Sequence, residues 1–185
     1  MHRIDPDSAL VMSIRTGDKK ALAALVEKHK KMAFRTALGM VGNREDAYDI
    51  SQEAFLRVYR SAETYDQKQP FLPWFYAIIA NLSKTWLKRR QVAAKRSLPL
   101  EETEYLISDD ASPESQVIEA ETIQRLRQAL LQLDFDDREI IMLQHFRNMS
   151  YDEIAETLGI PRGTVMSRLY YARKKLANLM RRSDG

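Results

Sequence analysis

The sequence predicts an all-α protein made of two small helical domains joined by a flexible acidic linker. Apolar residues recur at spacings of three and four along most of the 185 residues, and no stretch alternates as a strand does. Six glycines and six prolines are too few for the many tight turns of a sheet-rich protein. Between the two helical parts, residues 97–116 carry Pro99 and Pro113 and show no apolar period, which indicates the linker.

Three helices are predicted in the first domain, residues 1–96. The first spans 19–38 and ends at the glycines that follow, and the second spans 44–60. A loop at 61–73 leads into the third helix, 73–91, because a proline fits the first turn of a helix. The expected core side chains of these helices are Leu22, Leu25, Val26, Ala33, Ala37, Ala47, Ile50, Ala54, Val58, Phe75, Ile78, Ile79, Leu82 and Trp86.

The second domain, residues 117–185, begins within a helix that starts near Pro113 and runs to Leu133. A turn at 134–137 and a short helix at 138–146 follow. Ser150 and Glu153 then form a capping box that opens a helix, Gly159 ends that helix, and Ile160-Pro161 starts the next. The buried stripe of this last helix is predicted to be Val165, Leu169, Ala172, Leu176 and Met180.

Two helices joined by such a short turn predict a helix-turn-helix. In this motif the second helix enters the DNA major groove with its first residues facing base edges. The side chains off the buried stripe are Arg162, Thr164, Met166, Ser167 and Tyr170, followed by the basic Arg168, Arg173, Lys174 and Lys175, which suit phosphates. The alternative is a helical hairpin that only packs, with its basic side in water.

Charge is unevenly distributed. Residues 1–96 hold 18 Lys and Arg against 10 Asp and Glu, residues 97–122 hold none against 8, and residues 123–185 hold 11 against 8. Two basic blocks around an acidic connector favour a polyanionic partner, although solvated helix surfaces give the same pattern.

Several function classes are excluded by composition. The absence of cysteine removes disulfides, thiolate metal sites and thiol catalysis, and the three scattered histidines favour no metal site. There is no phosphate-binding glycine loop and no carboxylate cluster with metal geometry, so we expect no enzyme activity, cofactor or small-molecule substrate. No apolar stretch is long enough to insert in a membrane, which favours a cytoplasmic protein.

Three segments together resemble one family, the bacterial extracytoplasmic-function (ECF) RNA polymerase sigma factors. Residues 149–169, MSYDEIAETLGIPRGTVMSRL, are similar to the conserved region 4.2 of that family. Residues 46–55, DAYDISQEAF, resemble its region 2.2, and residues 71–81, FLPWFYAIIAN, resemble its regions 2.3 to 2.4. Order, spacing and total length also agree.

The resemblance implies a transcription initiation factor with a sigma-2-like helical bundle (1–96) and a sigma-4-like helix-turn-helix domain (117–185). It would bind RNA polymerase core and direct it to promoters in a stress response. Docking on the clamp helices of the largest polymerase subunit would use Asp49, Gln52, Glu53 and Leu56. The melted −10 element would be held by Tyr65, Asn81, Lys84, Lys88, Arg89 and Arg90. The duplex −35 element would be read by Arg162, Thr164, Met166, Ser167, Arg168, Tyr170, Arg173 and Lys174.

The sequence departs from many relatives where Met166 and Tyr171 replace a basic residue, which leaves the preferred promoter open. The resemblance also implies an anti-sigma protein as regulator, and a linker that either threads a polymerase channel or serves as a spacer. Two other functions compete with this hypothesis: a stand-alone helix-turn-helix regulator that binds duplex operators, and an enzyme acting on nucleic acid. The regulator needs a dimerisation or sensor domain that the basic N-terminal part does not resemble.

Overall fold

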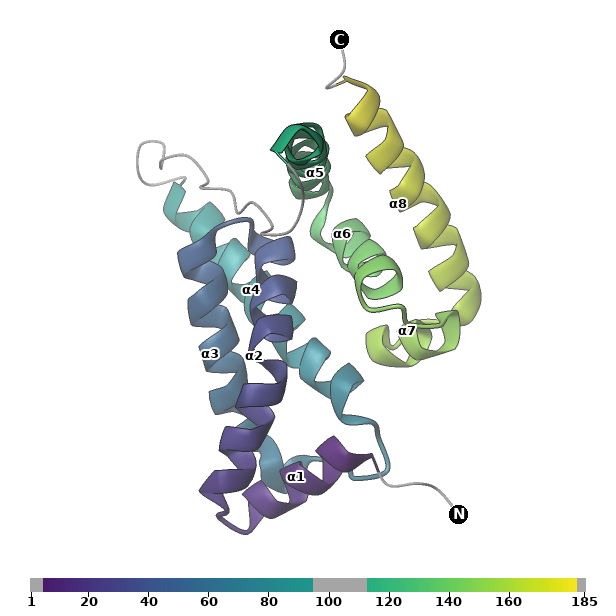
Figure 1. Cartoon of the computed structure of the whole chain (residues 1–185). Helices are drawn as coiled ribbons and strands as arrows, with labels where there is room; N and C mark the ends of the chain where they lie inside the picture. Colours follow the sequence, from purple (N-terminus) through teal and green to yellow (C-terminus); the bar gives the residue numbers. More distant parts are fainter. Residues whose placement is uncertain (1–4, 95–112, 183–185) are drawn as a thin grey trace. The chain divides into compact units, whose positions relative to one another are not determined.

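The protein is described by a computed structural model over residues 5–94 and 113–182, which are helical along nearly their whole length (Figure 1). No strand occurs within these ranges, and the predicted all-α class is confirmed. The chain divides into two compact units, residues 1–38 with 45–96 and residues 39–44 with 97–185. Of the predicted linker, residues 97–112 lie outside the described part, and residues 113–116 form the first turn of a helix.

The first unit is built from α1 (Pro6–Arg15), α2 (Lys19–Val41), α3 (Arg44–Ser61), a 3₁₀ turn η1 (Ala62–Thr64) and α4 (Phe71–Ala94), with residues 39–44 at the turn from α2 to α3 assigned to the second unit. Polar caps begin the first two helices, because the Asp5 carboxylate accepts from the Asp7 N–H and the Asp18 carboxylate from the Lys20 N–H. Gly42, at φ 76°, takes the left-handed conformation that ends α2 and lets the chain return as α3. Figure 1 shows α2 and α3 side by side.

In the core of this unit, the predicted stripe residues Ala33 and Ala37 of α2 and Ala47 and Ala54 of α3 are fully buried. Aromatic rings fill the space that the alanines leave, since the Phe75 ring centroid lies 5.1 Å from that of Phe71 and 4.9 Å from that of Phe55. The predicted core residues Ile78, Leu82 and Trp86 of α4 are half-buried. The buried residues of this helix are Phe71, Phe75, Tyr76, Ile79, Ala80 and Ser83.

Two features differ from the sequence-based expectation. The helix α1 was not predicted, and α4 begins at Phe71 rather than Pro73. The helix α1 does carry a local signal, since the Asp5 side chain caps it and Pro6 occupies its first turn. The earlier start of α4 has a tertiary cause: the Asp5 carboxylate accepts a 2.9 Å hydrogen bond from the Phe71 N–H and so caps the first turn of α4 from another helix. A cap supplied from 66 residues away leaves no local pattern.

The second unit contains α5 (Pro113–Gln132), α6 (Phe135–Ile141), a π-helical turn η2 (Met142–Phe146), α7 (Tyr151–Leu158) and α8 (Arg162–Arg182). The long helix α8 packs on α5, α6 and α7. The buried Arg138 closes the end of α5 by donating to the carbonyl oxygens of Leu130 and Leu133, at 2.8 and 3.0 Å. Burial lowers the pKa of Arg138 to about 10, so the guanidinium stays charged at neutral pH.

Candidate nucleic-acid and protein interfaces

The turn between α7 and α8 has the predicted helix-turn-helix geometry. The Ser150 N–H donates to the Glu153 carboxylate at 2.7 Å, and the Glu153 N–H donates to the Ser150 hydroxyl at 3.3 Å, which completes the capping box. Gly159, at φ 64°, ends α7 in the left-handed conformation. Val165, Leu169 and Ala172 are buried as predicted, while Leu176 and Met180 are half-buried. The rest of α8 is thereby turned outward.

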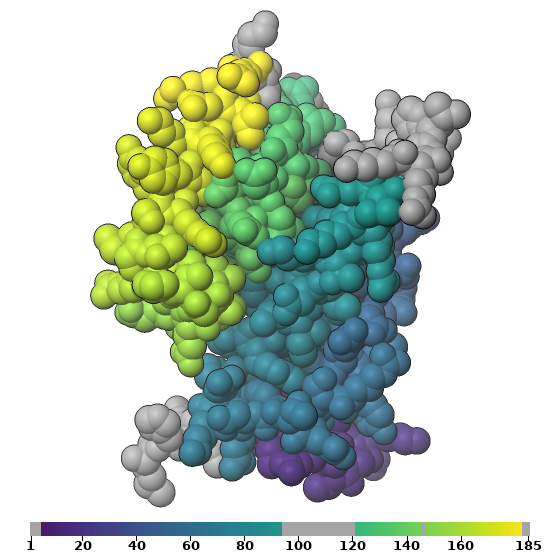
Figure 2. Space-filling model, turned by 180° about the vertical axis from the view of Figure 1, so that it is seen from behind, coloured from purple at the N-terminus to yellow at the C-terminus, as the bar shows by residue number. Residues whose placement is uncertain are grey.

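The predicted −35 residues lie mostly on this outward side. Met166 is 53% exposed and Tyr170 is 62% exposed, and only Thr164 among the eight is half-buried. Figure 2 shows the outward side chains of α8 (yellow) as an extended part of the surface. An exposed strip of cationic, hydroxyl and apolar side chains on one helix has the chemistry that major-groove readers use.

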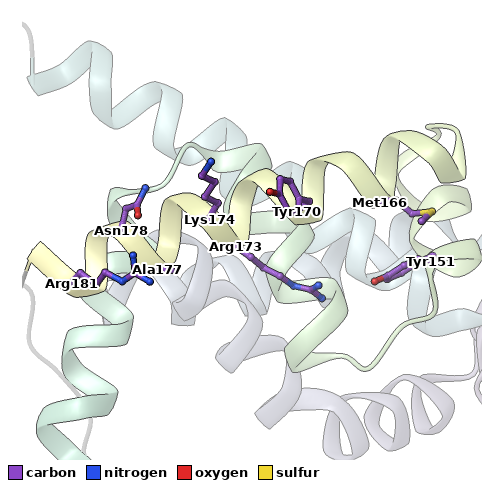
Figure 3. A pocket seen from close by; sticks show the side chains of 8 residues that line it. All are labelled: Tyr151, Met166, Tyr170, Arg173, Lys174, Ala177, Asn178 and Arg181. Carbon is purple, nitrogen blue, oxygen red and sulfur yellow. The ribbon is translucent and has the colours of Figure 1, made fainter.

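Along this strip runs an open groove of about 690 Å³, which we call the α8 groove (Figure 3). Its lining residues are Tyr151, Met166, Tyr170, Arg173, Lys174, Ala177, Asn178 and Arg181. In Figure 3, Tyr151 at the start of α7 lies beside Met166, and the other side chains follow along α8. The groove is therefore apolar toward the start of α8 and cationic toward its end.

Four of these lining residues were missed by the sequence analysis: Tyr151, Ala177, Asn178 and Arg181. The spacing from Met166 through Tyr170, Arg173 and Ala177 to Arg181 is helical, so extending the predicted face by two turns would have found Ala177 and Arg181. Asn178 lies four residues after Lys174 and follows from the same extension. Tyr151 belongs to another helix and leaves no such signal.

Some basic side chains of α8 are engaged within the unit. Arg162 pairs with Asp152 at 3.5 Å, and the Arg173 Nε–H donates to Nε2 of His145 at 3.2 Å. Burial, and then the charge of Arg173, lower the pKa of His145, which favours the neutral ring that can accept this bond. Lys175 donates to Asp137 and Asp134 on the side of α6, so two carboxylates compete with phosphate for its ammonium group.

The predicted −10 residues of α4 fall into two groups. Asn81, Lys88 and Arg89 are exposed and Lys84 is half-buried, so these four form an outward set that we call the α4 surface. Arg90, by contrast, pairs with Asp46 of α3 at 3.4 Å and lies 5.2 Å from the centre of the Trp86 ring. Its guanidinium therefore joins α3 to α4 instead of extending the cationic track.

Tyr65 is placed differently from the expectation that its ring would form a pocket wall for a base. Its side chain is 4% exposed, and its ring lies 4.6 Å from that of Trp74. The phenol hydroxyl donates to the Gln69 carbonyl oxygen, within the loop that precedes α4. A buried ring offers no face for a base to stack on, so Tyr65 shapes this loop from beneath.

The predicted docking residues lie together on α3. Asp49, Gln52 and Leu56 are exposed, and they share this side with Tyr48 and Tyr59, which the sequence analysis missed. The spacing 48, 52, 56 and 59 is that of one helix face and was the available signal. Glu53, at the edge of this α3 surface, pairs with Arg57 at 3.4 Å and Arg60 at 3.2 Å.

Within residues 5–94 and 113–182, no three acidic or histidine side chains are grouped so that they could hold a metal ion. In the same ranges, every helix is too short or too polar to cross a membrane.

Comparison with known proteins assigns both units. Residues 25–92 match Sigma-70 region 2, and residues 123–176 match Sigma-70, region 4. The ECF RNA polymerase sigma factor SigW of Bacillus subtilis is 30% identical over 179 residues, which cover 92% of this chain and 95% of SigW. The chain belongs to the ECF RNA polymerase sigma factors. This sigma factor is a promoter-directing initiation factor of RNA polymerase.

Other comparisons agree. The RNA polymerase sigma-H factor of Pseudomonas aeruginosa is 31% identical to this sigma factor, over 93% of this chain and 92% of the other. The fold is similar to that of CnrH in a complex with the cytosolic domain of CnrY, with a TM-score of 0.70 and 24% identity over 95% and 97% of the two chains. It is also similar to the sigma factor RpoE of Bartonella quintana in a complex with the anti-sigma factor NepR, with a TM-score of 0.72 and 20% identity over 88% and 98%.

Proposed function

We propose that this sigma factor divides promoter recognition between its two units, with the α8 groove placed on the duplex −35 element. The helix-turn-helix supports this assignment because its second helix presents its first turns to base edges. Met166 and Tyr170 contact bases there, while Arg168, Arg173 and Lys174 contact phosphates. Because Met166 has no hydrogen-bond donor, it favours the methyl group of a thymine over the acceptors of a guanine.

The α4 surface and the loop before it hold the non-template strand of the melted −10 element. A captured base needs amide and aromatic partners, and its phosphates need cations. Asn81 supplies the amide group, and Lys84, Lys88 and Arg89 supply the charge. Arg90 and Tyr65 act as positioning residues, because the first is paired with Asp46 and the second is buried.

The α3 surface docks on the basic clamp helices of the largest polymerase subunit. Its carboxylates are complementary to that charge, and its exposed Tyr48, Leu56 and Tyr59 supply apolar and aromatic contacts at the centre. Glu53 enters this interface by exchanging Arg57 and Arg60 for partners on the clamp. Surface pairs of this kind contribute about 0–1 kcal/mol, so the exchange is inexpensive.

An anti-sigma protein controls this activity by covering the first and second units. One solved relative, the sigma factor RpoE, is in a complex with the anti-sigma factor NepR, and this supports the proposal. The linker at 97–116 joins domains 1–96 and 117–185. The sigma factor acts in the cytoplasm with the polymerase, by binding alone, and the polymerase carries out the chemistry.

The observation that carries the proposal is the outward, cationic and apolar face of α8 in a chain that also has a sigma region 2. Run-off transcription with purified core polymerase and a library of promoters tests it. We expect sigma-dependent transcripts that share an upstream motif. Binding to duplex DNA without polymerase, with no transcripts and no core binding, would instead identify a stand-alone regulator.

A further inference from the structure

The helix α1 is joined to the loop before α4 by hydrogen bonds between buried and part-buried polar groups. The Asp5 carboxylate accepts from the Asp7 N–H with one oxygen, at 3.2 Å, and from the Phe71 N–H with the other, at 2.9 Å. One side chain therefore caps two helices that are distant in the sequence. Any shift of α1 moves the first turn of α4 with it.

A chain of hydroxyl groups makes a second connection between α1 and this loop. The Tyr65 hydroxyl donates its single proton to the Gln69 carbonyl oxygen at 2.5 Å. The Ser8 hydroxyl lies 2.6 Å from the Tyr65 oxygen, and donation by Tyr65 to Gln69 leaves Ser8 as the donor in that pair. The same Ser8 hydroxyl also lies 3.3 Å from the Asp5 carboxylate and 3.4 Å from the Gln69 carbonyl oxygen. Ser8 is 1% exposed. Burial raises the pKa of the Tyr65 phenol, which keeps the phenol protonated and able to donate.

On its other side, α1 is fastened to α2. The buried Asp7 accepts from Lys28 at 2.6 Å and is paired with His29 at 3.0 Å. The His29 ring lies 5.3 Å from that of Phe71, the first residue of α4. A broken buried network costs more than an exposed pair, so α1 is held firmly between α2 and the loop.

We propose that α1 is a positioning element for the loop at 65–70, in which Ser8 and Asp5 set the conformation that captures the melted −10 strand. This inference rests on the proposed function of the α4 surface. The loop side chains Asp66, Gln67, Lys68 and Gln69 are exposed, whereas Tyr65 beneath them is fixed by Ser8. Ser8 thus acts on DNA through the loop and does not touch it.

Two substitutions break the hydroxyl chain at different points. Ser8→Ala removes the donor, and Tyr65→Phe removes the hydroxyl while it keeps the ring on Trp74. Ser13→Ala is the matched control, because the Ser13 hydroxyl bonds to the Ala9 carbonyl within α1. Each variant is assembled with core polymerase on the promoter recovered by run-off transcription, and opening is followed by permanganate reactivity of the −10 thymines.

We expect Ser8→Ala and Tyr65→Phe each to slow opening by about three- to tenfold, the effect of one hydrogen bond. Because both act on one chain, the double variant should be no slower than either single variant. Core affinity, and opening on a promoter that is already mismatched at −10, should stay within about twofold of wild type. In a Trp86→Phe background, Ser8→Ala should also shift the emission of the remaining Trp74 to longer wavelength.

Distinct results would overturn the proposal. If the Ser8→Ala and Tyr65→Phe holoenzymes open the promoter as fast as the Ser13→Ala holoenzyme does, α1 does not position the loop. If affinity for core polymerase fell by the same factor as the opening rate, the hydroxyl chain from Ser8 to Gln69 would only support the fold. If the wild-type holoenzyme leaves the −10 thymines unreactive, the proposed function itself fails. If wild type opens the promoter and both variants open it equally fast, only the role of α1 fails.

Discussion

Met166 lies on the outward side of α8, where it is 53% exposed. Together with Tyr151 and Tyr170 it makes the apolar end of the α8 groove. A methyl group on the floor of the major groove is the only apolar feature that a base pair offers there, and thymine alone carries it. Promoter choice by this sigma factor should therefore depend on a thymine contact at one −35 position.

Replacing each −35 thymine by uracil removes only the methyl group. At the position that faces Met166 we expect holoenzyme binding to weaken by about fourfold, from roughly 0.8 kcal/mol per buried methyl-sized group. In Met166→Ala the same uracil should have no effect. The measurement is promoter affinity with the substituted duplexes, and a uracil penalty that persists in Met166→Ala would assign the contact to another residue.

Arg162 begins α8 and is paired with Asp152 at the protein surface. Arg162→Ala should lower promoter affinity by about tenfold, a loss of about 1.4 kcal/mol, because it removes a charge at the DNA-facing start of the helix. Core affinity should be unchanged, since exposed pairs contribute little to stability. Fluorescence titrations with core and with promoter duplex measure the two separately, and equal losses in both would indicate misfolding.

Glu53 pairs with Arg57 and Arg60, so its replacement affects both the charges on α3 and the contact with the polymerase clamp. Glu53→Arg would place three cations together on α3 and also oppose the basic clamp helices, and we expect at least a tenfold loss of core affinity, about 1.4 kcal/mol. Glu63→Arg, on the exposed η1, is the matched control with the same charge change. Unchanged core affinity in Glu53→Arg, with DNA binding by the second unit intact, would remove the docking assignment.

At the scale of elements, the turn between α7 and α8 depends on backbone conformation more than on packing. A Cβ added at Gly159 would meet no atom within 4 Å, yet its φ of +64° disfavours any side chain. Gly163, in α8, also has open space around its Cα but no positive φ. Substitutions at these two glycines therefore distinguish the effect of backbone strain from the effect of a steric clash.

Gly159→Ala should lower the free energy of unfolding by about 1–2 kcal/mol, the strain of a left-handed residue with a side chain. Gly163→Ala should raise it by about 0.5–1 kcal/mol, because alanine is favoured within a helix. Urea unfolding followed by circular dichroism compares both with wild type. Equal effects of the two substitutions would contradict the role of Gly159 as a conformational stop.

Elements with local signals were predictable, and elements with distant partners were not. The capping box at Ser150, the glycine at 159 and the alanine faces of α2 and α3 are properties of neighbouring residues. The start of α4 at Phe71 depends on the bond from Asp5, 66 residues away, and the Tyr65 hydroxyl contacts Ser8, 57 residues away. Arg90 and Lys175 pair with carboxylates that are distant in the sequence. The sequence analysis could not see these partners and counted Arg90 among the DNA contacts.

At the scale of the whole molecule, the exposed cationic side chains of the α4 surface and the α8 groove make promoter binding depend on salt. Each phosphate contact adds about one to the slope of log affinity against log salt. Arg181, in the α8 groove, should be such a contact, so Arg181→Gln should reduce that slope by about one. Lys175 is engaged by Asp134 and Asp137, so Lys175→Gln should leave the slope unchanged.

The test is a series of holoenzyme affinities between low and moderate salt for wild type and both variants. A slope that falls in Lys175→Gln and not in Arg181→Gln would reverse the assignment of the two side chains. Because core polymerase is common to all three, its own salt dependence cancels in the comparison.

The separation of the two sides of α8 has a consequence for evolution. Val165, Leu169 and Ala172 hold the helix in place, while Met166, Tyr170 and the basic residues around them face outward. Exposed substitutions usually change stability by less than about 0.5 kcal/mol. A duplicated gene can therefore exchange its outward residues, acquire a new set of promoters and leave the old set to its parent, without passing through an unfolded intermediate sequence.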